Sequence, residues 1–273
     1  MSVTRYLCVG VGLLLALGAL FAPWLAPYDP IATSILEKLK PPVFVEGFDG
    51  THWLGTDQLG RDLFSRCLHG MRVSVGIAVL GLLASSVLGT VAGLVAGLMG
   101  GWVDRFVMMV ADIFIAMPFL LLVLVGIALF GSDIPVLIAL VGLARWETYA
   151  RIVRGQVLQV REQPYIEVSR LFGASETWIA FRHVLPNISS TLLVLLTLNF
   201  PSILLLESSL SFLGLGVQPP TASLGRMVGD GRDHLILSWW VAVVPATVIL
   251  LITFVVQLLG DWLRDLLDVR LTE

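Results

Sequence analysis

Residues 145–187, RWETYARIVRGQVLQVREQPYIEVSRLFGASETWIAFRHVLPN, form the one long polar stretch in a chain that is otherwise mostly apolar. This stretch holds six of the seventeen Lys and Arg residues, together with four carboxylates. Charged side chains are costly inside a lipid bilayer, so we expect the segment to lie outside the membrane. The apolar sequence on both sides of it then decides the class of fold.

The polar stretch is predicted to form two short helices joined at a glycine. Pro164 suits a first helical turn, where its missing N–H is not needed. Gly173 can adopt the left-handed conformation that ends a helix, and Ser175 can cap the next one. The segment should therefore be a helix–turn–helix on the membrane surface.

The second short helix is predicted to end near Val184. Pro186 disfavours helical geometry at Leu185, the residue before it. Asn187 is then a suitable N-cap for the apolar helix that follows.

The composition indicates an integral membrane protein. The 273 residues are 57% hydrophobic and 14% charged, and the mean hydropathy is +0.90. A net charge of −3 leaves no basic surface for nucleic acid, so we expect no nucleic-acid partner. Cys8 and Cys67 give no sign of a disulfide framework.

Six apolar segments are predicted to cross the membrane, which makes the chain an all-α polytopic protein. A cleaved signal peptide is the alternative for the first segment. With six spans both termini lie on the side of the polar stretch, and that side holds ten Lys and Arg residues against seven, which favours the cytoplasm. The segments are about 7–26, 73–103, 106–130, 134–152, 188–206 (interrupted by Pro201) and 235–260.

Three features lie inside these segments. Gly89, Gly93 and Gly97 share one helix face and allow close helix approach, either in a moving seam or in a static one. Asp112 is a candidate pathway residue, or a salt-bridged or interfacial carboxylate about two turns from Arg105. In the same span, Pro118 is expected to kink the helix.

The polar sequence before the second span contains residues that suggest a site. His52, Asp57 and Asp62 could be metal ligands, but no second histidine stands at ligand spacing. Gly55 and Gly60 indicate turns, so a structured surface loop is the favoured interpretation.

The spacing within the polar stretch resembles a known motif. Glu167 is followed by Gly173 and then by Pro186 at the spacing of the Glu-Ala-Ala-x3-Gly-x9-Ile-x-Leu-Pro loop, with His183 at the Ile position. That loop belongs to the membrane subunits of binding-protein-dependent ABC importers. The resemblance implies a coupling helix that docks into a cleft on a cytoplasmic ATPase; the alternative is an ordinary cytosolic loop with a glycine turn. The implied coupling residues are Glu167, Val168, Ser169, Gly173, Ala174 and Pro186.

Three further stretches resemble one branch of that family, the second permease subunit of dipeptide, oligopeptide and nickel importers. They are HWLGTDQLGRDLFSR at 52–66, ESSLSFLGLGVQPP at 207–220 and DWLRD at 261–265. The resemblance implies a type I ABC importer permease fold, with the coupling helix between transmembrane helices 4 and 5. It divides the chain into a first helix and extracytoplasmic loop (1–71), a permease core (72–261, coupling loop 150–187) and a cytoplasmic tail (262–273).

The sequence excludes ATP hydrolysis by a P-loop, because glycine precedes neither Lys38 nor Lys40. All four histidines lie outside the predicted spans, which argues against a histidine-based intramembrane site. The chain is therefore predicted to be non-catalytic, with no cofactor of its own.

By resemblance, its partners are a homologous second permease, two cytoplasmic ABC ATPases that hold ATP and magnesium, an extracytoplasmic substrate-binding protein and membrane lipid. Its location is the bacterial inner membrane. Di- or oligopeptides are the expected substrates; nickel complexes, glutathione or opine-like solutes are alternatives, and a stand-alone secondary carrier is the alternative from another class. Asp112 and Glu207 are the candidate pathway residues.

Overall fold

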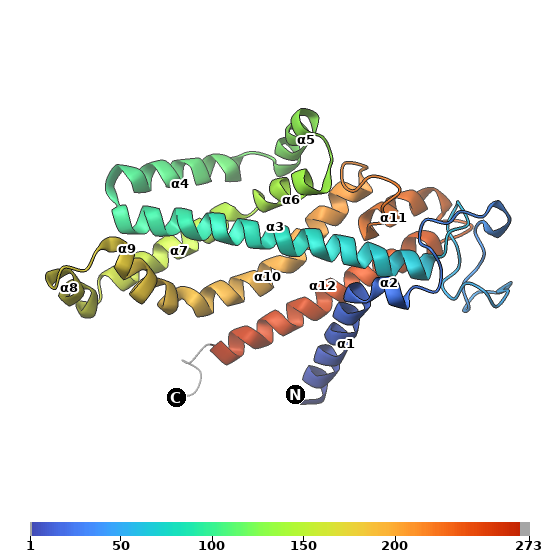
Figure 1. Cartoon of the computed structure of the whole chain (residues 1–273), viewed down its shortest axis with the longest axis horizontal. Helices are drawn as coiled ribbons and strands as arrows, with labels where there is room; N and C mark the ends of the chain where they lie inside the picture. The colour runs from blue at the N-terminus through green and yellow to red at the C-terminus, as the bar shows by residue number, and fades with distance from the viewer. Residues whose placement is uncertain (1, 268–273) are drawn as a thin grey trace.

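The computed structural model describes residues 2–267, and this part of the chain contains helices but no β-strand. A single isolated bridge joins Thr56 and Asp62. Long helices run side by side along the longest axis of the molecule (Figure 1). The predicted all-α fold is confirmed for these residues.

The longest connection between α-helices is the stretch at 26–62, between α2 and α3. Two 3-10 turns, Ile35–Glu37 and Arg232–His234, and a π-helical segment, Ala180–Val184, complete the described structure. The α-helices are α1 (Ser2–Leu20), α2 (Ala22–Leu25), α3 (Leu63–Met99), α4 (Gly101–Ala116), α5 (Phe119–Phe130), α6 (Ile134–Gly142), α7 (Trp146–Arg161), α8 (Pro164–Leu171), α9 (Glu176–Ile179), α10 (Leu185–Phe212), α11 (Leu224–Gly231) and α12 (Trp240–Leu267).

Within residues 2–267, three helices are long and apolar enough to cross a membrane: Leu63–Met99, Glu176–Phe212 and Trp240–Leu266. The pair α4 and α5 would make a fourth if it counts as one bent span, and Tyr6–Leu20 is a shorter apolar helix. The predicted number of six spans stays a prediction.

The second span begins earlier than predicted, at Leu63 instead of residue 73. Asp62 caps it, because its Oδ2 accepts a hydrogen bond from the backbone N–H of Ser65 at 2.7 Å. The predicted domain boundary at residue 71 therefore falls inside α3.

The third predicted span is a broken pair of helices, so the expectation of one kinked helix is wrong. Pro118 forces Met117 out of the helical region, to φ −83° and ψ 135°, and α4 and α5 meet at 94°. The fourth predicted span is also divided, since α6 ends at Gly142 and α7 begins at Trp146. Ser85 Oγ donates to the carbonyl of Gly142 at 2.6 Å and satisfies the end of α6.

Two later boundaries also differ from the prediction. Pro201 does not interrupt its helix, because α10 runs through it from Leu185 to Phe212 and loses only the one N–H that proline lacks. The last span begins at Trp240 instead of residue 235. It continues to Leu267, so the predicted tail at 262–273 begins as helix, and residues 268–273 lie outside the described part.

The three spaced glycines of α3 pack directly against α7. A Cβ on Gly89 would lie 2.3 Å from the carbonyl oxygen of Trp146, and one on Gly93 would lie 2.6 Å from that of Ala150. Gly97 faces Val157 in the same way, at 2.7 Å. The predicted close approach at these glycines is confirmed, and it places α7, which leads into the polar segment, directly against α3.

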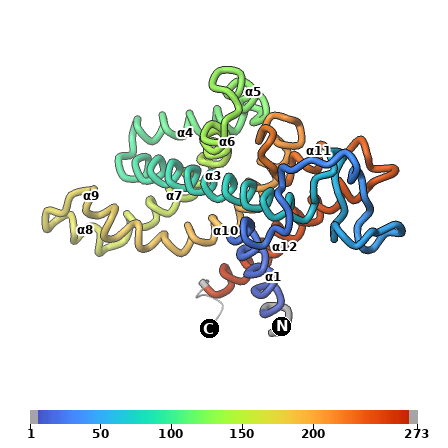
Figure 2. The backbone as a smooth tube through the Cα atoms, turned by 45° about the vertical axis from the view of Figure 1, so that its right-hand side comes forward, coloured from blue at the N-terminus to red at the C-terminus, as the bar shows by residue number. Residues whose placement is uncertain are grey.

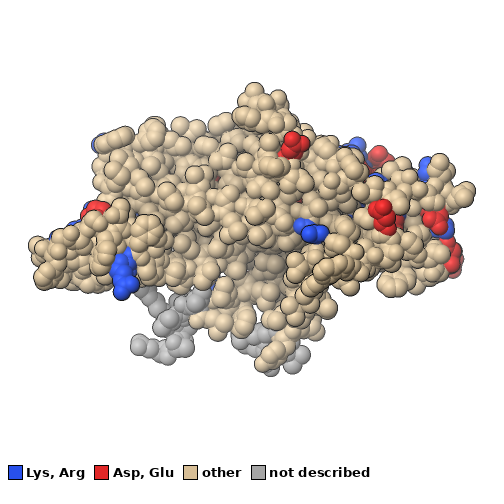
Figure 3. All heavy atoms as spheres, in the orientation of Figure 1, with Lys and Arg blue, Asp and Glu red and all other residues tan. Residues whose placement is uncertain are grey.

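The two polar parts of the chain lie at opposite ends of the molecule. The α8–α9 segment (residues 164–179) occupies one end, and the loop at 26–62 occupies the other (Figures 1 and 2). On the face drawn in Figure 3, most of the charged side chains lie toward these two ends, and apolar atoms fill most of the middle. This distribution fits a protein whose middle lies in lipid.

The loop at 26–62 is structured, as predicted, but the three residues considered as metal ligands are buried instead of lying on the surface. His52, Asp57 and Asp62 are each less than 5% exposed. His52 Nδ1 lies 2.9 Å from Asp62 Oδ1, and Arg61 Nε donates to Asp57 Oδ2 at 2.7 Å. These polar contacts between buried side chains hold the loop together.

Candidate functional site: the α8–α9 segment

Helix α8 is amphipathic, and its inner face anchors it to the membrane helices. Pro164 stands in the first turn, where no intrahelical partner for an N–H is lost. Ile166 is fully buried in an apolar cluster with residues of α7, α9 and α10. The other buried members of this cluster are Val153, Val157, Val160, Ile179, Val184 and Ile188.

The outer face of α8 is apolar and exposed. Phe172 is 89% exposed, Leu171 82% and Val168 49%. Large apolar side chains gathered at one exposed tip are typical of a surface that binds another protein.

The turn between α8 and α9 is a Schellman motif. Gly173 has φ +85°, its N–H donates to the carbonyl of Arg170 at 2.9 Å, and the N–H of Ala174 donates to that of Ser169 at 3.0 Å. Arg170 and Glu176 close the turn with two hydrogen bonds, at 2.9 and 3.2 Å. The predicted left-handed conformation of Gly173 is confirmed.

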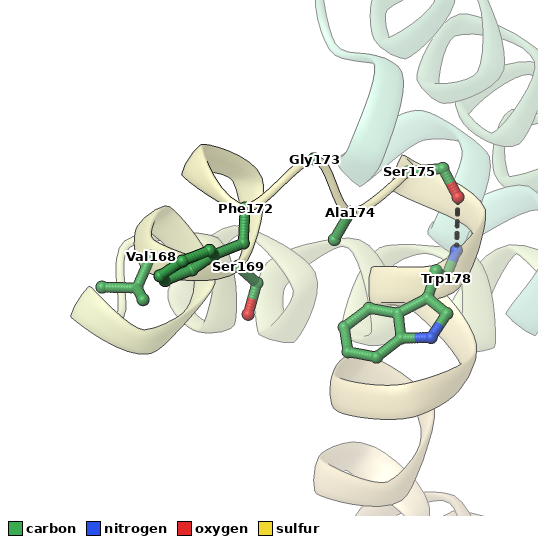
Figure 4. Close-up of a pocket in the computed structure, with 7 residues that line it drawn as sticks. All are labelled: Val168, Ser169, Phe172, Gly173, Ala174, Ser175 and Trp178. Atoms are coloured by element: carbon green, nitrogen blue, oxygen red, sulfur yellow. Dashed lines mark hydrogen bonds between the residues drawn. The ribbon is translucent and has the colours of Figure 1, made fainter.

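Ser175 caps α9, as predicted, because its Oγ accepts a hydrogen bond from the N–H of Trp178 at 3.2 Å. A hollow of about 560 Å³ lies between the two helices. Phe172 and Trp178 approach it from opposite sides (Figure 4). Its lining residues are Val168, Ser169, Phe172, Gly173, Ala174, Ser175 and Trp178.

The predicted end of the second short helix near Val184 is wrong. Leu185 is helical, with φ −55° and ψ −46°, and the helix continues unbroken from Glu176 to Phe212. The turn before Pro186 is π-helical, and this wider turn makes room for the proline ring, which would clash with a carbonyl in a regular helix. A proline therefore does not end this helix.

Asn187 is not an N-cap, so that prediction is also wrong. It lies inside the continuous helix, and its Nδ2 donates to the hydroxyl of Tyr165 at 3.1 Å. Asn187 thus ties α10 to α8 through a side chain.

His183 forms the other link between the α8–α9 segment and α10. Its ring lies 5.5 Å from that of Tyr165 and 5.1 Å from that of Trp178, measured between centroids. Ser169 Oγ is 3.4 Å from His183 Nε2. Sequence reasoning missed the roles of Tyr165 and Trp178; the only signal was an aromatic residue near each helix start.

The six predicted coupling residues all lie in or beside the α8–α9 segment. Glu167 is exposed, and within the described part of the chain it has no ion pair. Ala174 is half-buried against the apolar cluster around Ile166, which we call the anchoring cluster, while Pro186 is exposed on the continuous helix. The motif thus presents one face to the protein and another to its surroundings.

The two candidate pathway residues lie elsewhere and apart. Asp112 pairs with Arg151 of α7 and not with Arg105, which donates to the carbonyl of Gly101 in its own helix. Glu207 is 2% exposed, and the hydroxyl of Ser211 donates to its Oε1 at 2.8 Å. Only Asp112 is open to the surroundings.

Two family models match the chain. The model described as "Binding-protein-dependent transport system inner membrane component" matches residues 89–273. The model described as "N-terminal TM domain of oligopeptide transport permease C" matches residues 6–42. Together they cover both ends of the chain.

Named relatives resemble almost the whole chain. The di/tripeptide transport system permease protein DppC of Pseudomonas aeruginosa (strain UCBPP-PA14) is 40% identical over 259 residues, which are 95% of this chain and 86% of that protein. The glutathione transport system permease protein GsiD of Salmonella typhimurium is 41% identical over 262 residues, which are 96% of this chain and 85% of that protein.

A solved structure shares the fold. An inward-facing conformation of the MetNI methionine ABC transporter aligns with a TM-score of 0.59 at 17% identity, over 74% of this chain and 96% of that chain. The family model matches more than half of the chain, and the matched residues include the α8–α9 segment. The permease DppC is 40% identical over 95% of the chain. The chain belongs to the family of inner membrane components of binding-protein-dependent transport systems.

Proposed function

We propose that this chain is the permease subunit of an ATP-driven importer of di- and oligopeptides, and that its α8–α9 segment transmits the motion of an ATPase to the membrane helices. The observation that carries the proposal is the two-sided construction of α8. Ile166 anchors one face in the protein core, while Leu171 and Phe172 on the other face are more than 80% exposed.

The continuous helix from Glu176 to Phe212 supports this proposal. A force applied to α8 reaches α9 through the salt bridge between Arg170 and Glu176 and through the ring of His183. Because the helix then runs without a break into α10, movement at its outer end would move a membrane-crossing helix as a rigid element.

We infer the partners from the family to which the chain belongs. The exposed tip of α8 would dock into a cleft on one of two cytoplasmic ATPases, which hold ATP and magnesium. A homologous permease would supply the other half of the pathway, and a binding protein would deliver substrate from the opposite side. The chain itself is then non-catalytic and binds no cofactor, and both its termini lie in the cytoplasm.

The relatives favour peptides as the substrate. DppC is named for di- and tripeptides, and GsiD for glutathione, itself a modified tripeptide. We infer a short peptide for this chain, with glutathione as the second candidate.

The test is ATP-dependent uptake of a labelled dipeptide into vesicles that hold this chain with its co-purified partners. A Gly173→Pro variant should assemble but lose uptake, because proline removes the N–H that bonds to Arg170 and cannot adopt the φ of +85°. Gly155→Ala is the matched control, because this glycine of α7 has open space around it.

Three outcomes distinguish the hypotheses. Loss of uptake in Gly173→Pro alone supports coupling through this turn. Normal uptake in that variant, or transport without any ATPase, contradicts it and favours a secondary carrier. An excess of unlabelled glutathione that blocks uptake more strongly than dipeptide does would assign the site to glutathione.

A further inference from the structure

Helix α10 is packed in two different ways along its length. None of the residues from Ser189 to Asn199 is buried in this chain, whereas eight of the twelve residues from Phe200 to Ser211 are. Pro201 stands where the packing changes. The half that continues from α9 is therefore held loosely by the rest of the chain, and the other half is held tightly.

The tightly held half contains Glu207, the one charged residue of α10. The hydroxyl of Ser211 donates to Glu207 Oε1 at 2.8 Å, and the hydroxyl of Ser74 on α3 bonds to the same carboxyl group. Ser211 Oγ accepts from the N–H of Val217 at 3.3 Å, and Ser74 Oγ accepts from the N–H of Leu224, the first residue of α11, at 3.2 Å. Glu207 therefore joins α10 to α3, to α11 and to the connection between α10 and α11.

These hydrogen bonds require an acceptor at position 207. The hydroxyls of Ser74 and Ser211 each accept from a backbone N–H, and the proton of each hydroxyl then needs an acceptor of its own. A carboxylate has two oxygens and serves both hydroxyls, whereas an amide has one oxygen and a leucine has none. A buried polar group that loses its partner is costly, so the acceptor stabilises this junction of helices.

Two glycines of α11 bring its backbone against the same half of α10. A Cβ on Gly229 would lie 2.8 Å from the carbonyl oxygen of Phe212, and one on Gly225 would lie even closer to that of Ser208. Closely packed interiors leave little room for one element to shift against another. The end of α10 after Pro201 is thus clamped between α3 and α11.

Pro201 provides a place where the helix can bend. Proline has no N–H, so the carbonyl of Thr197 lacks its usual helical partner. A bend at this turn breaks no hydrogen bond between these two residues, and sharp bends in helices are concentrated at proline. The helix is continuous in this structure, and its weakest turn lies at the border between the loose half and the clamped half.

We propose that residues 176–200 pivot at Pro201 during transport, and that Glu207 is the positioning residue that holds the remainder of α10 in place. This inference rests on the proposed function and names the point about which the moving helix turns; the rigid element is then residues 176–200. A displacement that begins at the α8–α9 segment should decrease along the helix toward Pro201. It should not reach the part of α10 that is clamped against α11.

The first test is a set of spin-label distances in the assembled importer, measured with and without a non-hydrolysable ATP analogue and magnesium. The labels are placed on Phe181→Cys, Leu193→Cys and Leu205→Cys, each paired with a label on Arg232→Cys directly after α11. Leu193 and Leu205 are matched, because they lie in one helix and are 51% and 50% exposed. Cys8 is replaced by serine in all variants, and the other native cysteine is buried and can stay.

The expected shifts differ between the three positions. Phe181 and Leu193 precede Pro201 by about 30 and 12 Å of helix, so the distance from Phe181→Cys should shift roughly 2.5 times as much as that from Leu193→Cys. The distance from Leu205→Cys should not change. Equal shifts at all three positions would overturn the pivot and leave ATP coupling standing, while no shift at any position would contradict the proposed function itself.

The second test stiffens the pivot. Pro201→Ala supplies an N–H for the carbonyl of Thr197 and favours the helix, so it should lower the ratio of peptide imported to ATP hydrolysed without lowering the unfolding temperature. Pro245→Ala is the matched control, because Pro245 is also a buried proline inside a helix, but α12 does not continue into the α8–α9 segment. The control should keep the ratio of the unmodified chain. An unchanged ratio in Pro201→Ala would overturn the pivot.

The third test releases the clamp. Glu207→Leu removes the acceptor for both serine hydroxyls, so the distance from Leu205→Cys should begin to shift when the ATP analogue binds. Glu207→Gln keeps one acceptor and should allow a smaller shift; it also decides the matter where the leucine variant does not assemble. A residue with a merely structural role would lower the unfolding temperature and leave this distance fixed, and that result would remove Glu207 from the proposal.

Discussion

The ring of Tyr165 lies against that of His183, with centroids 5.5 Å apart, and this contact joins α8 to the helix that enters the membrane as α10. The same tyrosine accepts a hydrogen bond from Asn187 through its hydroxyl. Two side chains on the continuous helix therefore hold one residue of α8, and the ring contact is the natural place to test rigidity.

Replacing Tyr165 with alanine should lower the amount of peptide imported per ATP hydrolysed, because α8 could then move without moving α10. An aromatic pair contributes about 0.5–1.5 kcal/mol beyond its buried area. Tyr165→Phe, which keeps the ring and loses only the hydroxyl, should retain most of the coupling. The measurement is uptake and ATP hydrolysis in the same vesicles.

A double variant separates this contact from general damage. If the rings act as a pair, Tyr165→Ala with His183→Ala should lower coupling by less than the sum of the single effects. Fully additive effects would contradict a link through the rings.

Replacing Ser175 with alanine should loosen the start of α9. The lost cap costs about 1 kcal/mol, because the N–H of Trp178 loses its acceptor. Hydrogen exchange at that amide should become about fivefold faster, and Ser175→Asp should restore protection. Unchanged exchange in the alanine variant would show that the cap does not stabilise this turn.

Replacing Gly89 with alanine should lower the free energy of unfolding by about 3 kcal/mol, since the new methyl group would clash with the backbone of Trp146. The control is Gly76→Ala in the same helix, where a methyl group meets open space and should be neutral or slightly stabilising. Thermal unfolding in detergent measures both. Equal unfolding temperatures for the two variants would mean that α3 and α7 can move apart at no cost.

The loop at 26–62 should be ordered best near neutral pH. Hydrogen bonds from Lys40 lower the pKa of Asp49 and of Glu37, and the bond to Asp49 raises the pKa of Lys40. The carboxylates therefore stabilise the loop above about pH 4 and lose this contribution as the pH falls, while Lys40 loses its contribution as the pH rises past about 10.

Hydrogen exchange of residues 28–62, corrected for its intrinsic pH dependence, measures this effect. Protection should fall below about pH 4, and 1 M salt should weaken it because the three side chains are partly exposed to solvent. Lys40→Gln should remove most of the dependence on pH. A variant that keeps the full dependence would show that the ion pairs of Lys40 are not its cause.

Several local features could be predicted because their causes lie within one helical turn. The left-handed turn at Gly173 needs only a residue without a side chain, and the cap at Ser175 needs only a hydroxyl three residues before a free N–H. The seam of Gly89 and Gly93 was visible as a repeat of four along the chain.

Other local rules failed where packing outweighed them. Pro186 was expected to end a helix, but the wider π-helical turn before it makes room for the proline ring. Ile179, just before that turn, and Val184, within it, are buried in the same apolar cluster as Ile166, and this packing keeps the two sides of the turn in one helix. Pro118 had a larger effect than expected, because a full break there turns α5 away from α4.

The sequence by itself determined that this chain is a helical membrane protein interrupted by one long polar stretch at 145–187, because these properties depend on the composition of continuous segments. The tertiary structure decided which residues meet across helices. Arg151 pairs with Asp112 at a separation of 39 residues, and His183 contacts Tyr165 on another helix. Such contacts depend on how whole helices pack, and no pattern within one segment specifies that arrangement.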